Sequence, residues 1–171
     1  MEETLALVNR IIKDHEQIII GIQTSEEIAN DVVAILELER PLESFVPGRL
    51  DDQRQSLRDL QQSLERVDKM LQEHFGREEK SLLSALEKRR NKTLASAFSS
   101  LLDEHKELTA RLAKLKEDVA ELVTEGLSRS LWEGKAYGMR AYIRHTQRLI
   151  EAHAETEQSL LQTVRKELER A

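Results

Sequence analysis

The chain has no cysteine among its 171 residues, and it holds only two prolines and six glycines. Without cysteine there can be no disulfide framework, thiolate zinc site, iron–sulfur cluster or cysteine nucleophile. Aromatic residues make up 4% of the chain, whereas charged residues make up 34% and hydrophobic residues 39%. This balance, with so few helix-breaking residues, is typical of a protein built from long helices. The length suits one core, so we expect residues 1–171 to form a single domain.

Blocks of positive charge and long apolar runs are also absent. The net charge of −6 is spread over both signs with no run of Lys and Arg, which argues against nucleic acid or an anionic membrane as a partner. No apolar run approaches the length of about 18 residues that a membrane-spanning helix needs. The first residues, MEETLALVNR, carry acids where a signal peptide carries bases. We therefore expect a cytoplasmic protein.

Four long stretches carry apolar residues three and four positions apart, the spacing typical of amphipathic helices. Short breaks separate them at residues 40–49, 88–93 and 125–133. In the last break, Ser130 and Glu133 have the spacing of a capping box at the start of a helix. Short connections between long helices predict an all-α protein, an antiparallel up-down-up-down four-helix bundle.

Each apolar stripe is interrupted by histidine or glutamate. The third stripe is the clearest and consists of Leu94, Phe98, Leu101, Leu108, Leu112, Leu115, Val119 and Leu122, with His105 in its gap. The second stripe resumes after its gap at Leu82 and Ala85. The residues that fill the gaps in all four stripes are His15, His74, Glu78, His105, His153 and Glu157. Four of them form two His-x3-Glu pairs, in HFGRE and HAETE, and this spacing puts both side chains of a pair on one helix face.

These residues are predicted to lie at one height in the bundle. Two residues on antiparallel neighbours share a height when the chain between them folds back at its midpoint. The midpoint between His15 and His74 falls in the first break, and that between His74 and His105 falls in the second. The midpoint between His105 and His153 falls in the third. The apolar stripes do not by themselves require this agreement.

Four imidazoles and two carboxylates in one layer favour a first-row transition metal over Ca²⁺ or Mg²⁺, which prefer oxygen ligands. Two carboxylates that can bridge suggest two ions with about two histidines each, and a pair of irons is the natural interpretation. The alternative is a metal-free interaction module whose polar layer only sets the helix register. That layer would leave buried carboxylates desolvated or protonated at a cost of several kcal/mol apiece, so we favour a metal.

Around these residues the sequence resembles the hemerythrin-like (HHE cation-binding) family. The matching pieces are KDHEQI around His15, HFGREEKSLL at 74–83, DEHKEL around His105 and HAETEQSLL at 153–161. Their order and the four helices extend the resemblance over nearly the whole chain.

The resemblance implies a di-iron centre in which each iron takes two histidines and two glutamates bridge the irons. The implied groupings are His15 with His74, His105 with His153, and Glu78 with Glu157 as the bridges. An oxo, hydroxo or water ligand would complete the bridge. The implied function is to bind or sense O₂, NO or peroxide, or to handle iron.

One departure from the oxygen-carrying hemerythrins lies in the third helical stretch. Those proteins place a second histidine four residues after the one in the third helix, where this chain has Thr109. The long separation of His15 from His74 also predicts first and second helices that extend beyond the site. A more open site than that of an oxygen carrier follows. A di-iron enzyme with peroxidase-like, catalase-like or NO-reducing activity is therefore the alternative function.

The remaining polar residues near these motifs are assigned other roles. His145, the fifth histidine, is predicted to lie outside the metal site, because it is rotated away from His153 on the helix. Glu16, Glu79 and Glu104 each adjoin a candidate ligand and are expected in solvent, or else as hydrogen-bond partners of the histidines.

Four residues suggest contacts between helices or chains. Gly134 and Gly138 share a helix face, which predicts a close helix contact or a local irregularity. Ile20 points away from its stripe and, with Trp132, is a candidate contact in a homo-oligomer or with an unidentified protein partner.

Overall fold

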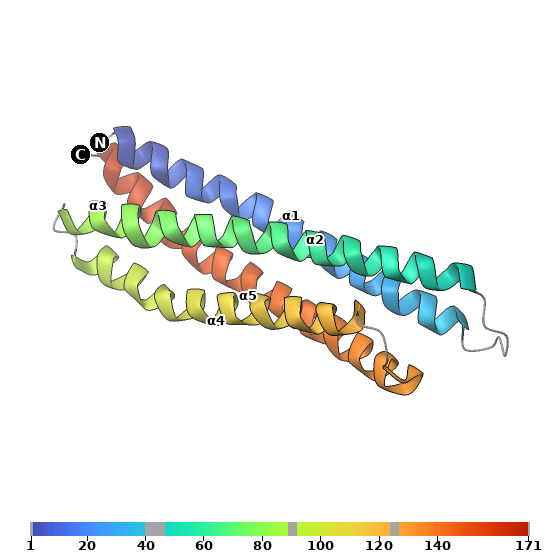
Figure 1. The fold of residues 1–171 in the computed structure, drawn as a ribbon. Helices are drawn as coiled ribbons and strands as arrows, with labels where there is room; N and C mark the ends of the chain where they lie inside the picture. The colour runs from blue at the N-terminus through green and yellow to red at the C-terminus, as the bar shows by residue number, and fades with distance from the viewer. Residues whose placement is uncertain (1, 40–46, 89–91, 124–126, 171) are drawn as a thin grey trace.

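The structure is a computed structural model that describes residues 2–39, 47–88, 92–123 and 127–170, without the side chains of 35–54 and 170. Its elements in chain order are α1 (Glu2–Glu39), α2 (Pro47–Arg77), the π-helical turn η1 (Glu78–Leu82), α3 (Leu83–Lys88), α4 (Lys92–Val123) and α5 (Arg129–Arg170). Because α2, η1 and α3 follow one another without a gap, they form one continuous rod (Figure 1). Within the described ranges only Leu127 and Ser128 lie outside a helix. The predicted all-α class is confirmed.

The four rods form a ring in which each rod packs on two others. α1 packs against α2 and α5, and α4 packs against the same two helices. The chain runs up and down along successive rods, so that the start of α1 and the end of α5 lie at the same end of the bundle as α3 and the start of α4 (Figure 1). This is the predicted antiparallel up-down-up-down four-helix bundle.

Two hydrogen bonds define the start of α5. Both differ from the roles that the sequence predicted for residues in this segment. The backbone N–H of Leu131 donates to Ser128 Oγ at 3.3 Å, so the capping residue is Ser128 and the predicted capping box at Ser130 is wrong. The indole N–H of Trp132 donates to the carbonyl of Leu122 at 2.9 Å. It thereby satisfies one of the carbonyls that a helix leaves free at its C-terminus. Trp132 thus has a partner within the chain.

The apolar interior consists of two separate clusters of buried side chains. The larger cluster contains residues such as Leu64, Leu112 and Ile143. The smaller one, at the end that carries the termini, includes Ile11 and Val164. All eight predicted apolar residues of the α4 stripe are buried, as is the histidine in its gap. The polar residues that interrupt the stripes lie between the two clusters.

α1 approaches α2 closely at Gly21. A Cβ atom added there would lie 2.9 Å from Met70 Cε and 3.0 Å from Val67 Cγ2 of α2. At Gly134 and Gly138, by contrast, an added Cβ would meet nothing within 4 Å. The prediction of a close contact or an irregularity at these two glycines is therefore wrong, since α5 continues through both.

Ile20 is 58% exposed, as its position off the stripe predicted. Among the described helices none is long and apolar enough to cross a membrane.

Substitutions at two glycines test this packing. We expect Gly21→Val to lower the free energy of unfolding by about 1–3 kcal/mol, because the added methyl groups collide with the stiff Val67 side chain. The matched change Gly138→Ala should raise it by roughly 0.5–1 kcal/mol, since alanine favours the helix and has open space there. Urea unfolding followed by circular dichroism measures both. A Gly21→Val variant as stable as the parent chain would contradict the close approach of α1 and α2.

Candidate metal centre

Six ionisable side chains meet in one layer between the two apolar clusters. All are buried, from Glu157 at 0% exposed to His15 at 6%. They come from every rod of the bundle: His15 from α1, His74 from α2, Glu78 from η1, His105 from α4, and His153 and Glu157 from α5. The structure thus brings together all six residues that the sequence singled out.

The first of two groups in this layer holds two histidines and both glutamates. His15 Nε2 lies 2.9 Å from Glu157 Oε2 and 3.2 Å from His74 Nε2. His74 Nε2 lies 3.1 Å from Glu78 Oε1 and 3.4 Å from Glu157 Oε2. One donor atom from each of these four residues falls within 4.8 Å of the others, so they can hold a metal ion together.

The second group joins the first through Glu78. It consists of Glu78, His105 and His153, whose donor atoms also lie within 4.8 Å of one another. Glu78 Oε2 is 3.3 Å from His105 Nε2, whereas Glu78 Oε1 faces His74. Glu157 Oε2 is also 3.6 Å from His153 Nε2. Each carboxylate therefore reaches histidines of both groups, which is the arrangement that a bridging ligand requires.

The π-helical turn begins at Glu78. Its backbone signature is the N–H of Leu83, which donates to the carbonyl of Glu78, five residues back. A π-turn takes one more residue than an α-turn, so the buried stripe beyond it moves by one position. Leu86 is consequently buried, and the predicted stripe residue Ala85 is only half-buried. The irregularity lies at the candidate ligand itself, as π-turns at functional sites often do.

Acidic residues beside the candidate ligands contact histidines on neighbouring helices. Glu79 Oε1 lies 2.9 Å from His105 Nδ1, and Glu104 Oε2 lies 2.8 Å from His153 Nδ1. Glu79 and Glu104 are both exposed and in contact with a histidine, so the two predicted roles occur together. Glu16, the third such residue, is exposed.

The site fits a cation because of its unpartnered polar atoms. Among the described residues, eight buried side-chain nitrogen and oxygen atoms have no hydrogen-bond partner, and all but the Gln147 oxygen belong to the six candidate ligands. Such atoms are costly to bury unless something binds them. Imidazole nitrogens together with carboxylate oxygens are a donor set that iron accepts.

Burial sets the charge of this layer. It lowers the pKa of His74 and of His105, so both rings are neutral at pH 7 and can offer a lone pair. Burial also raises the pKa of Glu78, and the adjacent Glu157 raises it further. For Glu157 burial acts in the same direction, but its contacts with Glu78, His15 and His74 outweigh it and lower the pKa. Glu78 is therefore the more readily protonated of the two carboxylates.

Two further residues contribute to the site and were not predicted from the sequence. The Phe75 ring, 4% exposed, stacks on the His105 ring with centroids 3.9 Å apart and planes 9° from parallel. The sequence feature that could have identified Phe75 is its position four residues after Leu71 of the second apolar stripe. Asp14 accepts a hydrogen bond from Arg77 Nε at 2.8 Å and lies 3.8 Å from His74 Nδ1; no periodicity indicated it.

Two residues weighed for the site lie outside it. His145 is exposed, with its Nδ1 atom 3.4 Å from Arg111 of α4, and it belongs to neither group of candidate ligands. Thr109 is half-buried, and its hydroxyl accepts a hydrogen bond from Gln72 Nε2 at 3.1 Å.

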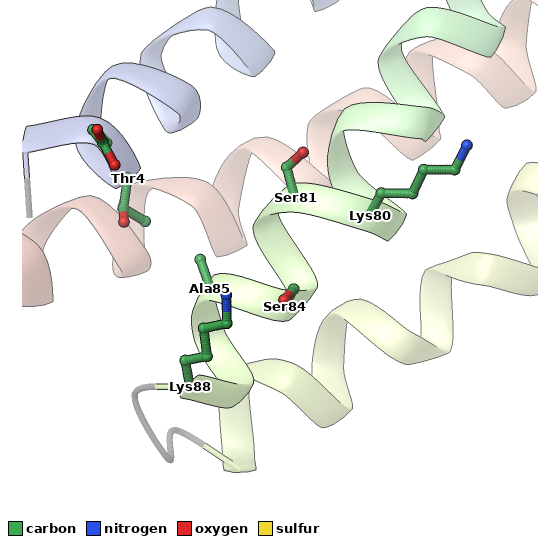
Figure 2. Close-up of a pocket in the computed structure, with 7 residues that line it drawn as sticks. Thr4, Lys80, Ser81, Ser84, Ala85 and Lys88 are labelled. Atoms are coloured by element: carbon green, nitrogen blue, oxygen red, sulfur yellow. The ribbon is translucent and has the colours of Figure 1, made fainter.

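A hollow of about 390 Å³ lies beside η1 but is separate from the metal layer. The hollow is lined by Glu3 and by the residues labelled in Figure 2, which are Thr4 of α1, Lys80 and Ser81 of η1, and Ser84, Ala85 and Lys88 of α3. None of the six candidate ligands is among these residues.

The metal-free protein should lose stability as the pH rises above 7. The pKa of Glu78 in the folded chain is raised above the ordinary value of 4.5, so the folded chain keeps a proton that the unfolded chain has released. Stability from this group is complete below pH 4.5 and is lost as the pH rises toward the raised value. The two histidines with lowered pKa values are neutral in both states above pH 7 and do not contribute there. We expect a decline of up to about 1.4 kcal/mol per pH unit, measured by urea unfolding with a chelator present.

The matched variants for this experiment are Glu78→Gln and Glu117→Gln. The first should flatten the alkaline decline, because glutamine cannot ionise. The second removes an exposed carboxylate on α4 and should leave the decline in place. An unchanged decline in Glu78→Gln would assign the lost proton to another group.

Comparison with protein families agrees with this geometry. The family model described as the hemerythrin HHE cation binding domain matches residues 6–164. Curated proteins and solved structures give no match. Since the family model covers almost the entire chain, the chain belongs to the hemerythrin HHE cation-binding domain family.

Proposed function

We propose that this chain binds two iron ions in the layer between its apolar clusters and uses them to bind or sense O₂, NO or peroxide, or to handle iron. In this proposal the pairs of histidine ligands are His15 with His74 and His105 with His153, and the bridging carboxylates are Glu78 and Glu157. The observation that carries the proposal is the pair of buried donor groups that share Glu78. Family membership supports it, since the family is one of cation-binding domains.

The protein would contribute position, protonation and exclusion of water. Iron at such a site supplies a Lewis acid and a redox centre. The two apolar clusters border the layer on both sides, and Phe75 lies flat against the His105 ring. The neutral imidazoles of His74 and His105 present lone pairs without first releasing a proton.

The surroundings of Thr109 favour a site with exchangeable positions over stable oxygen carriage. The Thr109 hydroxyl is engaged by Gln72, and the second donor group contains only two imidazoles, from His105 and His153. Fewer protein ligands leave more coordination positions for a small molecule. The same observation supports the second candidate function, a di-iron enzyme that consumes peroxide or reduces NO.

Iron loading tests the proposed ligands. Metal-free protein, incubated with Fe²⁺ under anaerobic conditions and then desalted, should retain two irons per chain as counted by mass spectrometry. His74→Ala and Glu78→Ala should each lose at least one iron, because each removes a donor from the shared layer. His145→Ala, which removes an exposed histidine, is the control and should keep both.

Two outcomes of iron loading would contradict the proposal. Loss of iron from His145→Ala would show that the ligand set is wrong. A folded parent chain that remains colourless and free of iron would favour a structural helical module instead.

Reactions of the loaded protein separate binding from catalysis. Reduced, iron-loaded protein is mixed with O₂, NO or H₂O₂ while its near-ultraviolet absorption is followed. A spectral change that reverses when the gas is removed indicates sensing or binding. Sustained consumption of H₂O₂ or NO over many equivalents indicates an enzyme. Glu78→Ala should abolish either response.

A further inference from the structure

We infer that the two halves of this site take up metal in order: Glu79 and Glu104 are positioning residues that prepare His105 and His153 for the first ion, and His15 is the last ligand to engage. The inference rests on the proposed metal-binding function. It concerns the hydrogen bonds behind each histidine, which differ among the four rings.

The rings of His105 and His153 already carry their protons on the correct nitrogen. An ionised carboxylate can only accept a hydrogen bond. The contacts of 2.9 Å to Glu79 and 2.8 Å to Glu104 therefore require a proton on Nδ1 of each ring. The Nε2 atom of each ring is then a free lone pair that faces the shared layer. A metal can bind these two rings without moving a proton.

His15 is in the opposite condition. Its Nε2 atom lies 2.9 Å from Glu157 Oε2, and this buried carboxylate accepts, so Nε2 carries the proton. The Nδ1 atom of His15 is buried and has no hydrogen-bond partner. Binding a metal through Nε2 requires the proton to leave that atom, and Nδ1 offers it no acceptor nearby. This rearrangement weakens His15 as a ligand.

His74 is intermediate between these cases. Its Nδ1 atom lies 3.8 Å from Asp14 Oδ2, beyond ordinary hydrogen-bond distance. The same Asp14 oxygen is paired with Arg77 at 2.6 Å. The strength of support thus falls from His153 and His105 through His74 to His15. The half that contains His105 and His153 is consequently the first to bind.

The two positioning glutamates can be changed without opening the core. Glu79 is 42% exposed and Glu104 is 50% exposed, whereas the rings they contact are 4% exposed. Removing either carboxylate should therefore leave the bundle folded, as circular dichroism can check. The control is Glu117→Ala, on the same helix as Glu104 and about 20 Å away along its axis.

The first experiment reads the proton positions directly. Long-range ¹⁵N NMR of the histidine side chains, in metal-free protein near neutral pH, distinguishes Nδ1–H from Nε2–H rings. We expect Nδ1–H at His105 and His153 and Nε2–H at His15. Glu79→Ala should change the His105 signal alone, and Glu79→Gln, which keeps an acceptor oxygen, should restore it. An Nε2–H form at His105 or His153 in the parent chain would overturn the inference.

The second experiment titrates metal-free protein with Co²⁺ and follows its visible absorption. The parent chain should fill in two resolved steps. Glu79→Ala and Glu104→Ala should each weaken the first step by about 10–100-fold, the usual effect of removing a partner behind a metal ligand. His15→Gln should remove the second step and leave the first unchanged, and the Glu117→Ala control should match the parent.

The outcomes separate the order of uptake from the proposed function. Two ions taken up together, or a first step weakened by His15→Gln, would overturn the order and leave the metal site standing. A parent chain that binds no Co²⁺ and no Fe²⁺ would overturn the proposed function. The NMR result would then still decide whether Glu79 and Glu104 set the ring protons.

Discussion

The burial of six ionisable groups in a single layer is the constraint on which the rest of this structure depends. Four imidazoles and two carboxylates are almost fully removed from water. Transfer of such groups out of water is unfavourable unless they meet partners. Burial raises the pKa of Glu78 and lowers those of His74 and His105, so the neutral form of each of these groups is favoured and part of this cost is met. The apolar clusters on either side supply the free energy that holds the layer closed.

Three of the candidate histidines each lie beside a carboxylate that comes from the preceding rod of the bundle. Asp14 of α1 lies near His74 of α2, and Glu79 of η1 contacts His105 of α4. Glu104 of α4 then contacts a histidine of α5. Contacts that tie adjacent helices together are thus the same contacts that orient the donors, so packing and site geometry cannot vary independently.

The sequence allowed the bundle and the convergence of the six donors to be predicted, but not their surroundings. Apolar periodicity states which side of a helix is buried, and the breaks fix the height at which antiparallel neighbours meet. Periodicity does not state how far two helices approach, so the contact at Gly21 was missed and one at Gly138 was wrongly expected. It also assumes a regular helix, and the π-turn at Glu78 breaks that assumption. Phe75 was overlooked because its neighbour His74 occupied the same stripe.

The ring of four rods gives the donor layer a property that no single helix has. A slip of one rod by one turn would displace its donor by about 5.4 Å, and a slip by one residue would turn it by roughly 100°. The first displacement exceeds the length of a metal–ligand bond, about 2 Å, and the second turns the donor away from the layer. Each of the two donor groups draws on three of the rods, so a cation bound there would favour aligned rods over shifted packings of the same apolar stripes. A bound ion would therefore stabilise the correct alignment of the helices in addition to any chemical role.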